Sequence, residues 1–331
     1  MSMTHSRRSV LRRGAGLSVA GTVASLAGCA GAADGGSGGF DSGYAAFFTL
    51  NDWTNEVAGE NATFEDPVDV GQLGHGWTPD GTLAADVAAT DAFVYLDSPE
   101  FSWAQDLAET LENDYDSVAA VDALSGLEGD LLEWDHSHGG EAGDHDGENH
   151  GDENHDGGET RHDPHVWVDP VLAAEMVETI AAGLGGADPE NADAYADELD
   201  AVDDAFESIA EDAARDVAVL AGHNSFQYLE ARYGFRLRSP VGVSPQNEPT
   251  QTEIADTIDL VDAEGIDVVL YDRFQSPRLA ESIVENSGAT EAVPVTPAGG
   301  TTREWNDAGY GYLEQMTEIN VPAFERAFGA Q

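Results

Sequence analysis

Histidine is the residue of this 331-residue chain best suited to chemistry, because a neutral imidazole is the commonest metal ligand in proteins. Three of the ten histidines stand where the chain leaves a predicted ordered element: His75 in GHGWTP, His165 in DPHVWVDP and His223 directly after DVAVLAG. Asp272 ends the strand-like run IDVVLYD in the same way. Because the carboxyl ends of strands line the ligand crevice in open α/β sheets, these four side chains would face one cleft. Three imidazole nitrogens and one carboxylate oxygen form a tetrahedral set suited to zinc.

Taken singly, each of these residues has an ordinary structural interpretation. A lone histidine beside a helix start is more often a cap or a surface residue than a ligand. Asp272 alone could be a helix-capping or salt-bridging acid in a chain rich in Asp. The prediction of a metal site therefore depends on the four positions taken together.

Six further histidines lie within residues 135–163, where Gly, Asp, Glu, Asn and His dominate. Such a composition cannot bury a core, so we expect a disordered loop. Flexible imidazoles among carboxylates bind zinc weakly because the loop must be ordered, and we interpret them as an accessory low-affinity arm. A solvated acidic insert that happens to be His-rich is the alternative. The six residues are His136, His138, His145, His150, His155 and His162.

The elements that must position the ligands alternate between strand and helix. The first half contains strand-like runs at 44–50, 91–97 and 116–124, and a helix is expected over 79–89 with Thr78 as its N-cap. This alternation predicts a parallel, doubly wound sheet.

The second half repeats the alternation after one long helical segment. Residues 188–215 carry apolar side chains spaced alternately by four and three, which is one face of a helix. We predict an α/β fold of two doubly wound Rossmann-like lobes, residues 44–187 and 216–331, joined by this single long linker helix. The apolar positions are Tyr195, Leu199, Val202, Phe206 and Ile209.

The first residues resemble an export signal. Arg7 and Arg8 form a twin-arginine pair, and the apolar stretch that follows is too short to span ~30 Å of hydrocarbon. The stretch ends in LAGC, which resembles a lipobox with Cys29 as the lipidated residue. We predict a Tat-type lipoprotein signal segment over 1–28 and a flexible tether over 29–43. The protein would then be extracytoplasmic, lipid-anchored to the outer face of the cell membrane.

Acidic residues outnumber basic ones by 64 to 13, and the sequence contains no Lys. This balance argues against a nucleic-acid partner, because little in the chain could neutralise a run of phosphates. Since 41% of the residues are apolar and occur in periodic runs, we expect a folded core. The acidity is typical of a protein adapted to very high salt, and a dedicated cation-binding surface is the alternative.

Four segments, GHGWTP, DPHVWVDP, LAGHNSFQYLEARYGF and LYDRFQSPRLAESIVENSGA, resemble in order and spacing the zinc/manganese solute-binding proteins of ABC transporters. The resemblance covers roughly residues 44–329. It implies two α/β lobes linked rigidly by a long helix, with the metal held between them. Carried over by motif, the metal ligands are His75, His165, His223 and Asp272. A histidine at 223, where manganese-binding members generally have a carboxylate, and a His/acid-rich insert before the second ligand are typical of the zinc-uptake branch.

The chain departs from the family pattern at two points. Relatives usually have Asp-Pro-His at the first ligand, whereas this chain has Leu73-Gly74-His75, so the local loop geometry is expected to differ. Asp272 is one methylene shorter than the Glu often found there, and its contact with the metal is either direct or through water.

The resemblance implies a non-enzymatic monomer that captures Zn²⁺ and delivers it to an ABC transporter membrane permease, with Mn²⁺ the less favoured ion. An extracellular zinc-dependent hydrolase is the alternative from another class, since three histidines plus a water fit either role if Asp272 stays off the metal. The sequence has no H-E-x-x-H motif and no Ser or Cys nucleophile motif. Adhesion to extracellular ligands, which this family sometimes acquires, is a third possibility that the sequence does not distinguish.

Overall fold

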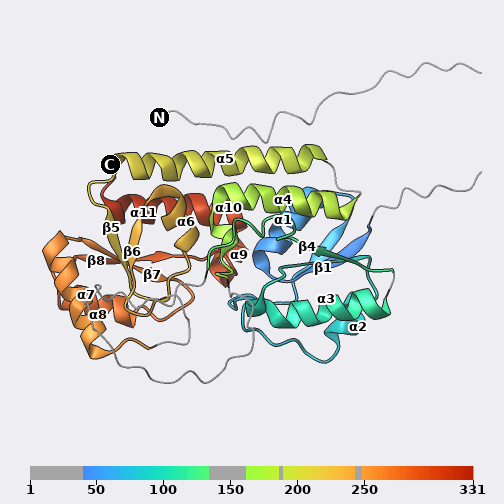
Figure 1. Cartoon of the computed structure of the whole chain (residues 1–331), viewed down its shortest axis with the longest axis horizontal. Helices are drawn as coiled ribbons and strands as arrows, with labels where there is room; N and C mark the ends of the chain where they lie inside the picture. Colours follow the sequence, from blue (N-terminus) through green and yellow to red (C-terminus); the bar gives the residue numbers. More distant parts are fainter. Residues whose placement is uncertain (1–39, 116, 134–161, 186–188, 243–247, 331) are drawn as a thin grey trace, which may run out of the picture. The chain divides into compact units, whose positions relative to one another are not determined.

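The structure, a computed structural model, describes residues 40–115, 117–133, 162–185, 189–242 and 248–330. Within these ranges the chain forms two four-stranded parallel sheets of the same strand order, β2-β1-β3-β4 and β6-β5-β7-β8 (Figure 1). The strands are β1 Ser42–Ala45, β2 Thr63–Glu65, β3 Ala92–Tyr95, β4 Ala119–Asp122, β5 Val217–Leu220, β6 Arg236–Arg238, β7 Val268–Asp272 and β8 Glu291–Val295.

Helices cover both faces of each sheet, which explains why the inner strands are apolar on both sides. Figure 1 shows α1 and α4 on one side of the first sheet and α3 on the other. All four residues of β5 are buried. The helices are α1 Phe48–Ala58, α2 Leu83–Val87, α3 Ser102–Asp114, α4 Pro170–Leu184, α5 Pro189–Asp212, α6 Gln227–Tyr233, α7 Gln251–Glu264, α8 Arg278–Glu285, α9 Arg303–Ala308, α10 Tyr312–Glu314 and α11 Val321–Phe328. Short 3₁₀ turns η2 and η3 span Pro99–Phe101 and Val166–Val168, and a π-helical turn η4 spans Gln315–Asn320.

The long helix α5 connects the two lobes. It packs against α1 and α4 of the first lobe and against α6 and α11 of the second (Figure 1). Its predicted apolar face is buried, and Phe206 packs edge-to-face on Phe324 of α11 with ring centroids 5.5 Å apart. One continuous apolar core contains residues of both lobes and of α5. The predicted fold, two doubly wound α/β lobes with a long connecting helix, is confirmed.

Two element boundaries were predicted wrongly in the first lobe. The expected strand 44–50 ends at Ala45, and α1 begins at Phe48 because the following buried residues recur at helical rather than alternating spacing. The expected helix over 79–89 is shortened to α2, because Asp80 Oδ1 accepts hydrogen bonds from the backbone N–H groups of Thr82 and Leu83 and forms a turn there. Thr82, rather than Thr78, is therefore the residue before the helix.

Two residues of the segment predicted as a disordered loop are described by the structure and are ordered. His162 forms an antiparallel bridge with Glu133, and Asp163 is buried, so these two residues belong to the ordered structure. Helix α3 and the three-residue strands β2 and β6 were not predicted. No described helix is long and apolar enough to cross a bilayer.

Candidate metal centre

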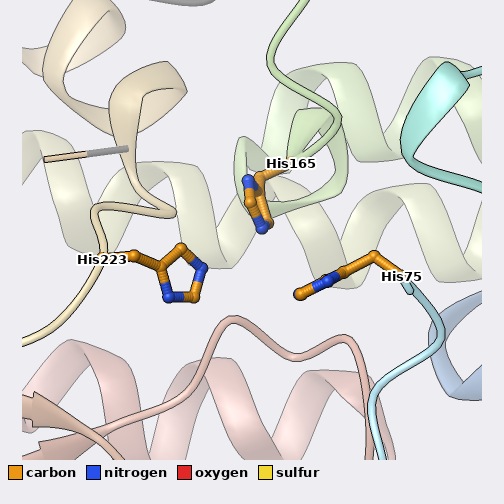
Figure 2. A group of neighbouring side chains, drawn as sticks. All are labelled: His75, His165 and His223. Carbon is orange, nitrogen blue, oxygen red and sulfur yellow. The ribbon is translucent and has the colours of Figure 1, made fainter. Parts of the chain in front are cut away.

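Three histidines from distant parts of the chain meet between the lobes. Figure 2 shows the rings of His75, His165 and His223 turned toward one another. One ring nitrogen from each lies within 4.8 Å of the other two, and among the described residues this is the group that could hold a metal ion. Nitrogens bound to one tetrahedral zinc at ~2.0–2.1 Å are ~3.3 Å apart, so each pair has to close by at most about 1.5 Å.

The Nε2 atoms of all three rings are buried and have no hydrogen-bond partner. A buried polar atom without a partner is costly, and three of them in one place indicate a ligand that the protein itself does not supply. The Nδ1 atoms of His165 and His223 each have a protein partner, which leaves Nε2 as the nitrogen available to a ligand.

A carboxylate fixes the ring of His165. Asp163 Oδ1 lies 2.6 Å from His165 Nδ1 and also accepts a hydrogen bond of 3.0 Å from the His165 backbone N–H. Both side chains are buried. A proton on Nδ1 that is donated to this carboxylate leaves the Nε2 lone pair free, an arrangement common around metal-bound histidines. Sequence reasoning missed Asp163, although it stands two residues before His165 in the same motif.

Close packing fixes the loop that carries His75. A Cβ on Gly74 would lie 2.5 Å from Phe47 Cβ and 3.0 Å from the Phe101 ring, so glycine is required there. Trp103 Nε1 donates a hydrogen bond of 3.3 Å to the Gly74 carbonyl. A proline at position 74 would clash in the same way, because proline also has a Cβ.

An amide, rather than a carboxylate, contacts His223. Gln275 Nε2 lies 2.7 Å from His223 Nδ1 and 3.1 Å from Asp272 Oδ2. Asp272 Oδ1 accepts a hydrogen bond of 2.9 Å from the backbone N–H of Phe274. Asp272 is therefore buried beside the centre, but the structure does not bring its oxygens into the group of three imidazole nitrogens. Sequence reasoning missed Gln275, whose signal is its place three residues after Asp272.

Burial keeps the imidazoles of His75 and His223 neutral. Burial, reinforced by neighbouring His165, lowers the pKa of His75 to about 4. Burial, reinforced by His165 and then His75, lowers the pKa of His223 to about 3. Burial likewise raises the pKa of Asp272 to about 6. Neutral imidazole is the form that coordinates a metal, so neither ring has to lose its charge before a cation binds.

Several contacts join the lobes beside the three histidines. Trp167, two residues after His165, donates from Nε1 to the carbonyl of Pro297, 2.7 Å away in the second lobe. Arg232 on α6 places Nε 2.6 Å from the carboxylate of Asp169, the N-cap of α4. These contacts fix the two halves of the centre relative to each other.

Of the six histidines predicted as accessory ligands, the structure describes His162 alone. His136, His138, His145, His150 and His155 lie outside the described residues, and so does Cys29. His162 is described, and it is not a member of the three-histidine group. Its role as an accessory ligand stays a prediction.

Two α/β lobes bridged by one long helix, with convergent imidazoles between them, define a two-lobed binding protein with a candidate metal centre. The chain belongs to the ZnuA family, described as zinc-uptake complex component A periplasmic, whose model matches residues 44–327.

Curated relatives carry related names. The chain is 30% identical over 290 residues to the zinc-binding lipoprotein AdcA of Streptococcus pneumoniae serotype 4, which is 85% of this chain and 54% of that protein. It is 24% identical over 281 residues to the high-affinity zinc uptake system protein ZnuA of Bacillus subtilis, covering 82% and 83%. The chain thus spans about half the length of the AdcA relatives that it matches.

Solved structures share the fold. The Zn(II)-bound ZnuA-like domain of Streptococcus pneumoniae AdcA superposes with a TM-score of 0.67 at 26% identity, over 88% of this chain and 99% of that one. The metal-dependent lipoprotein YcdH of Bacillus subtilis gives a TM-score of 0.70 at 21% identity, over 87% and 99%, which is a likeness of fold.

Proposed function

We propose that this protein captures Zn²⁺ between its two lobes and delivers it to the membrane permease of an ABC transporter. The observation that carries the proposal is the set of three buried Nε2 atoms without partners, on rings whose nitrogens lie within 4.8 Å of one another. His75, His165 and His223 are the proposed ligands. Asp272 is the proposed fourth donor, either after a local movement or through water.

The donor set favours zinc over manganese. Three neutral imidazoles suit zinc, whereas carboxylate and carbonyl oxygens suit manganese. The relatives named above are themselves called zinc-binding or zinc-uptake proteins.

The arrangement also favours binding over hydrolysis. A catalytic zinc needs an open position and a nearby base. Of the two carboxylates described at this centre, Asp163 is hydrogen-bonded to His165 and Asp272 to Phe274 and Gln275. Both carboxylates thus form hydrogen bonds within the centre, and capture and release is the better-supported role.

The cellular setting is proposed from the sequence and the relatives' names. AdcA is named a lipoprotein and ZnuA an uptake-system protein. A lipid on Cys29 would hold this chain at the outer face of the membrane, where a permease accepts the ion. The accessory histidines of residues 136–162 would raise the zinc concentration near the centre.

A competitive zinc titration in high salt tests the proposal. The comparison is between the wild type, a His165→Ala variant and a variant in which all six accessory histidines are replaced by Ala. We expect one tight zinc in the wild type and in the six-fold variant, and loss of the tight zinc in His165→Ala. Loss of tight binding with the accessory histidines, and its retention without His165, would overturn the assignment.

A further inference from the structure

Gln275 contacts both a proposed zinc ligand and the carboxylate beside it. We infer that Gln275 is a positioning residue, which orients the ring of His223 and holds Asp272 at the same time. The inference rests on the proposed function, because it concerns the zinc site described above. It assigns a role to a residue outside the predicted ligand set.

The contacts place one amide between two groups. Gln275 Nε2 is 2.7 Å from His223 Nδ1 and 3.1 Å from Asp272 Oδ2. An amide NH₂ has two hydrogens and can donate to both acceptors together. His223 and Asp272 are both buried, so these hydrogen bonds form where water competes weakly. With its Nδ1 edge held, the ring keeps Nε2 directed at the cluster.

The residue before His223 lies close to the amide of Gln275. Gly222 precedes His223, and a Cβ at Gly222 would lie 3.6 Å from Gln275 Oε1 and 4.0 Å from Asp272 Cβ. The segment just after β5 is therefore near the amide and the end of β7, with enough space there for a Cβ. Gln275 joins the ends of the two central strands of the second lobe.

An amide can serve both protonation patterns of the ring. When Nδ1 carries a lone pair, the amide N–H donates to it. A zinc ion on Nε2 requires the proton on Nδ1, and the amide oxygen can accept from that N–H after rotation of the terminal amide. An ionised Asp163 can only accept a hydrogen bond, so it requires the proton on His165 Nδ1 and leaves Nε2 free for a metal. The amide of Gln275, in contrast, can either donate to His223 Nδ1 or accept from it.

Two substitutions at position 275 separate the volume of the side chain from its hydrogen bonds. Leucine at 275 would fill similar volume but would leave His223 Nδ1 and Asp272 Oδ2 without this donor. Glutamate would still accept from the Nδ1–H of a zinc-bound ring. Partners of this kind typically change metal affinity by about 10–100-fold.

The test compares Gln275→Leu and Gln275→Glu with the wild type, and Gln251→Leu serves as a matched control at the exposed start of α7. Zinc affinity is measured by competition, the thermal midpoint is measured without zinc, and ¹⁵N NMR of the imidazoles is recorded with and without zinc. For Gln275→Leu we expect zinc affinity to fall by about 10–100-fold. The His223 nitrogen shifts should change while those of His165 stay. Gln275→Glu should bind zinc more tightly than the Leu variant, and Gln251→Leu should match the wild type.

Wild-type affinity and unchanged His223 shifts in Gln275→Leu would overturn the inference. Equal losses in the Leu and Glu variants would also overturn it, because a partner for Nδ1 would then have no effect. Absence of a tight zinc in the wild type is a separate result, since it refutes the proposed function itself.

Discussion

The two lobes have the same strand order but supply the centre from different strands. In the first lobe the histidines follow the two edge strands: His75 comes after β2 and His165 after β4. In the second lobe the side chains follow the two central strands, with His223 three residues beyond β5 and Asp272 at the last position of β7. The first lobe therefore supplies its side chains from beyond edge strands, and the second lobe supplies them from the ends of central strands.

This difference determines how each proposed ligand is held. The sheet itself positions a side chain at the end of a central parallel strand. His75 and His165 lie ten and forty-three residues beyond the ends of their strands, so loops must fix them. Gly74 packing and the Asp163 carboxylate supply that fixation.

Removing one imidazole from each lobe gives the largest expected effect. His165→Ala and His223→Ala should each lower zinc affinity by about two to three orders of magnitude, since one of three nitrogen donors is lost. Competitive titration measures this effect. A loss confined to one of the two variants would show that only one lobe binds the ion.

Asp163→Asn tests the fixation of the first-lobe ligand. The amide keeps an oxygen near His165 Nδ1 but removes the charge, so zinc affinity should fall by about 10–100-fold. Asp193→Asn, an exposed change on α5, is the control. If both variants bind zinc as the wild type does, the carboxylate is not what prepares His165.

Gly74→Ala tests the packing behind His75. The added methyl group meets Phe47 and Phe101, so the free energy of unfolding should fall by about 1–3 kcal/mol. Gly81→Ala, where a Cβ meets nothing within 4 Å, is the control. Denaturant unfolding without zinc measures both, and equal stability of the two variants would contradict the packing argument.

Asp66→Asn probes a half-buried carboxyl group in the loop that leads to His75. Burial raises the pKa of Asp66 to about 7, so the folded state binds more protons than the unfolded state between pH 3.8 and 7. Stability contributed by this group therefore rises as the pH falls through 7. The amide should stabilise the protein at pH 8, and the gain should shrink toward pH 4. Thermal midpoints across this range measure it, and a gain independent of pH would refute the assignment.

The sequence predicted the parts of the centre that follow from the alternation of strands and helices. Motif positions at strand ends and helix starts identified His75, His165 and His223, and the periodic face of α5 identified the connection between the lobes. Three-residue strands such as β2 carry too few residues for a periodic signal.

The partners of the imidazoles could not be predicted in the same way. Asp163 and Gln275 are common residue types, and only the fold shows which ring nitrogen each one meets. The placement of Asp272 depends on the hydrogen bonds from Phe274 and Gln275, which hold the short carboxylate beside the centre.

Anomalous diffraction at the zinc absorption edge, from crystals grown in high salt with one equivalent of zinc, tests the central claim most directly. We predict one zinc ion bonded to Nε2 of His75, His165 and His223 at ~2.0–2.1 Å. A zinc ion bound elsewhere, with these three imidazoles free of metal, would contradict it.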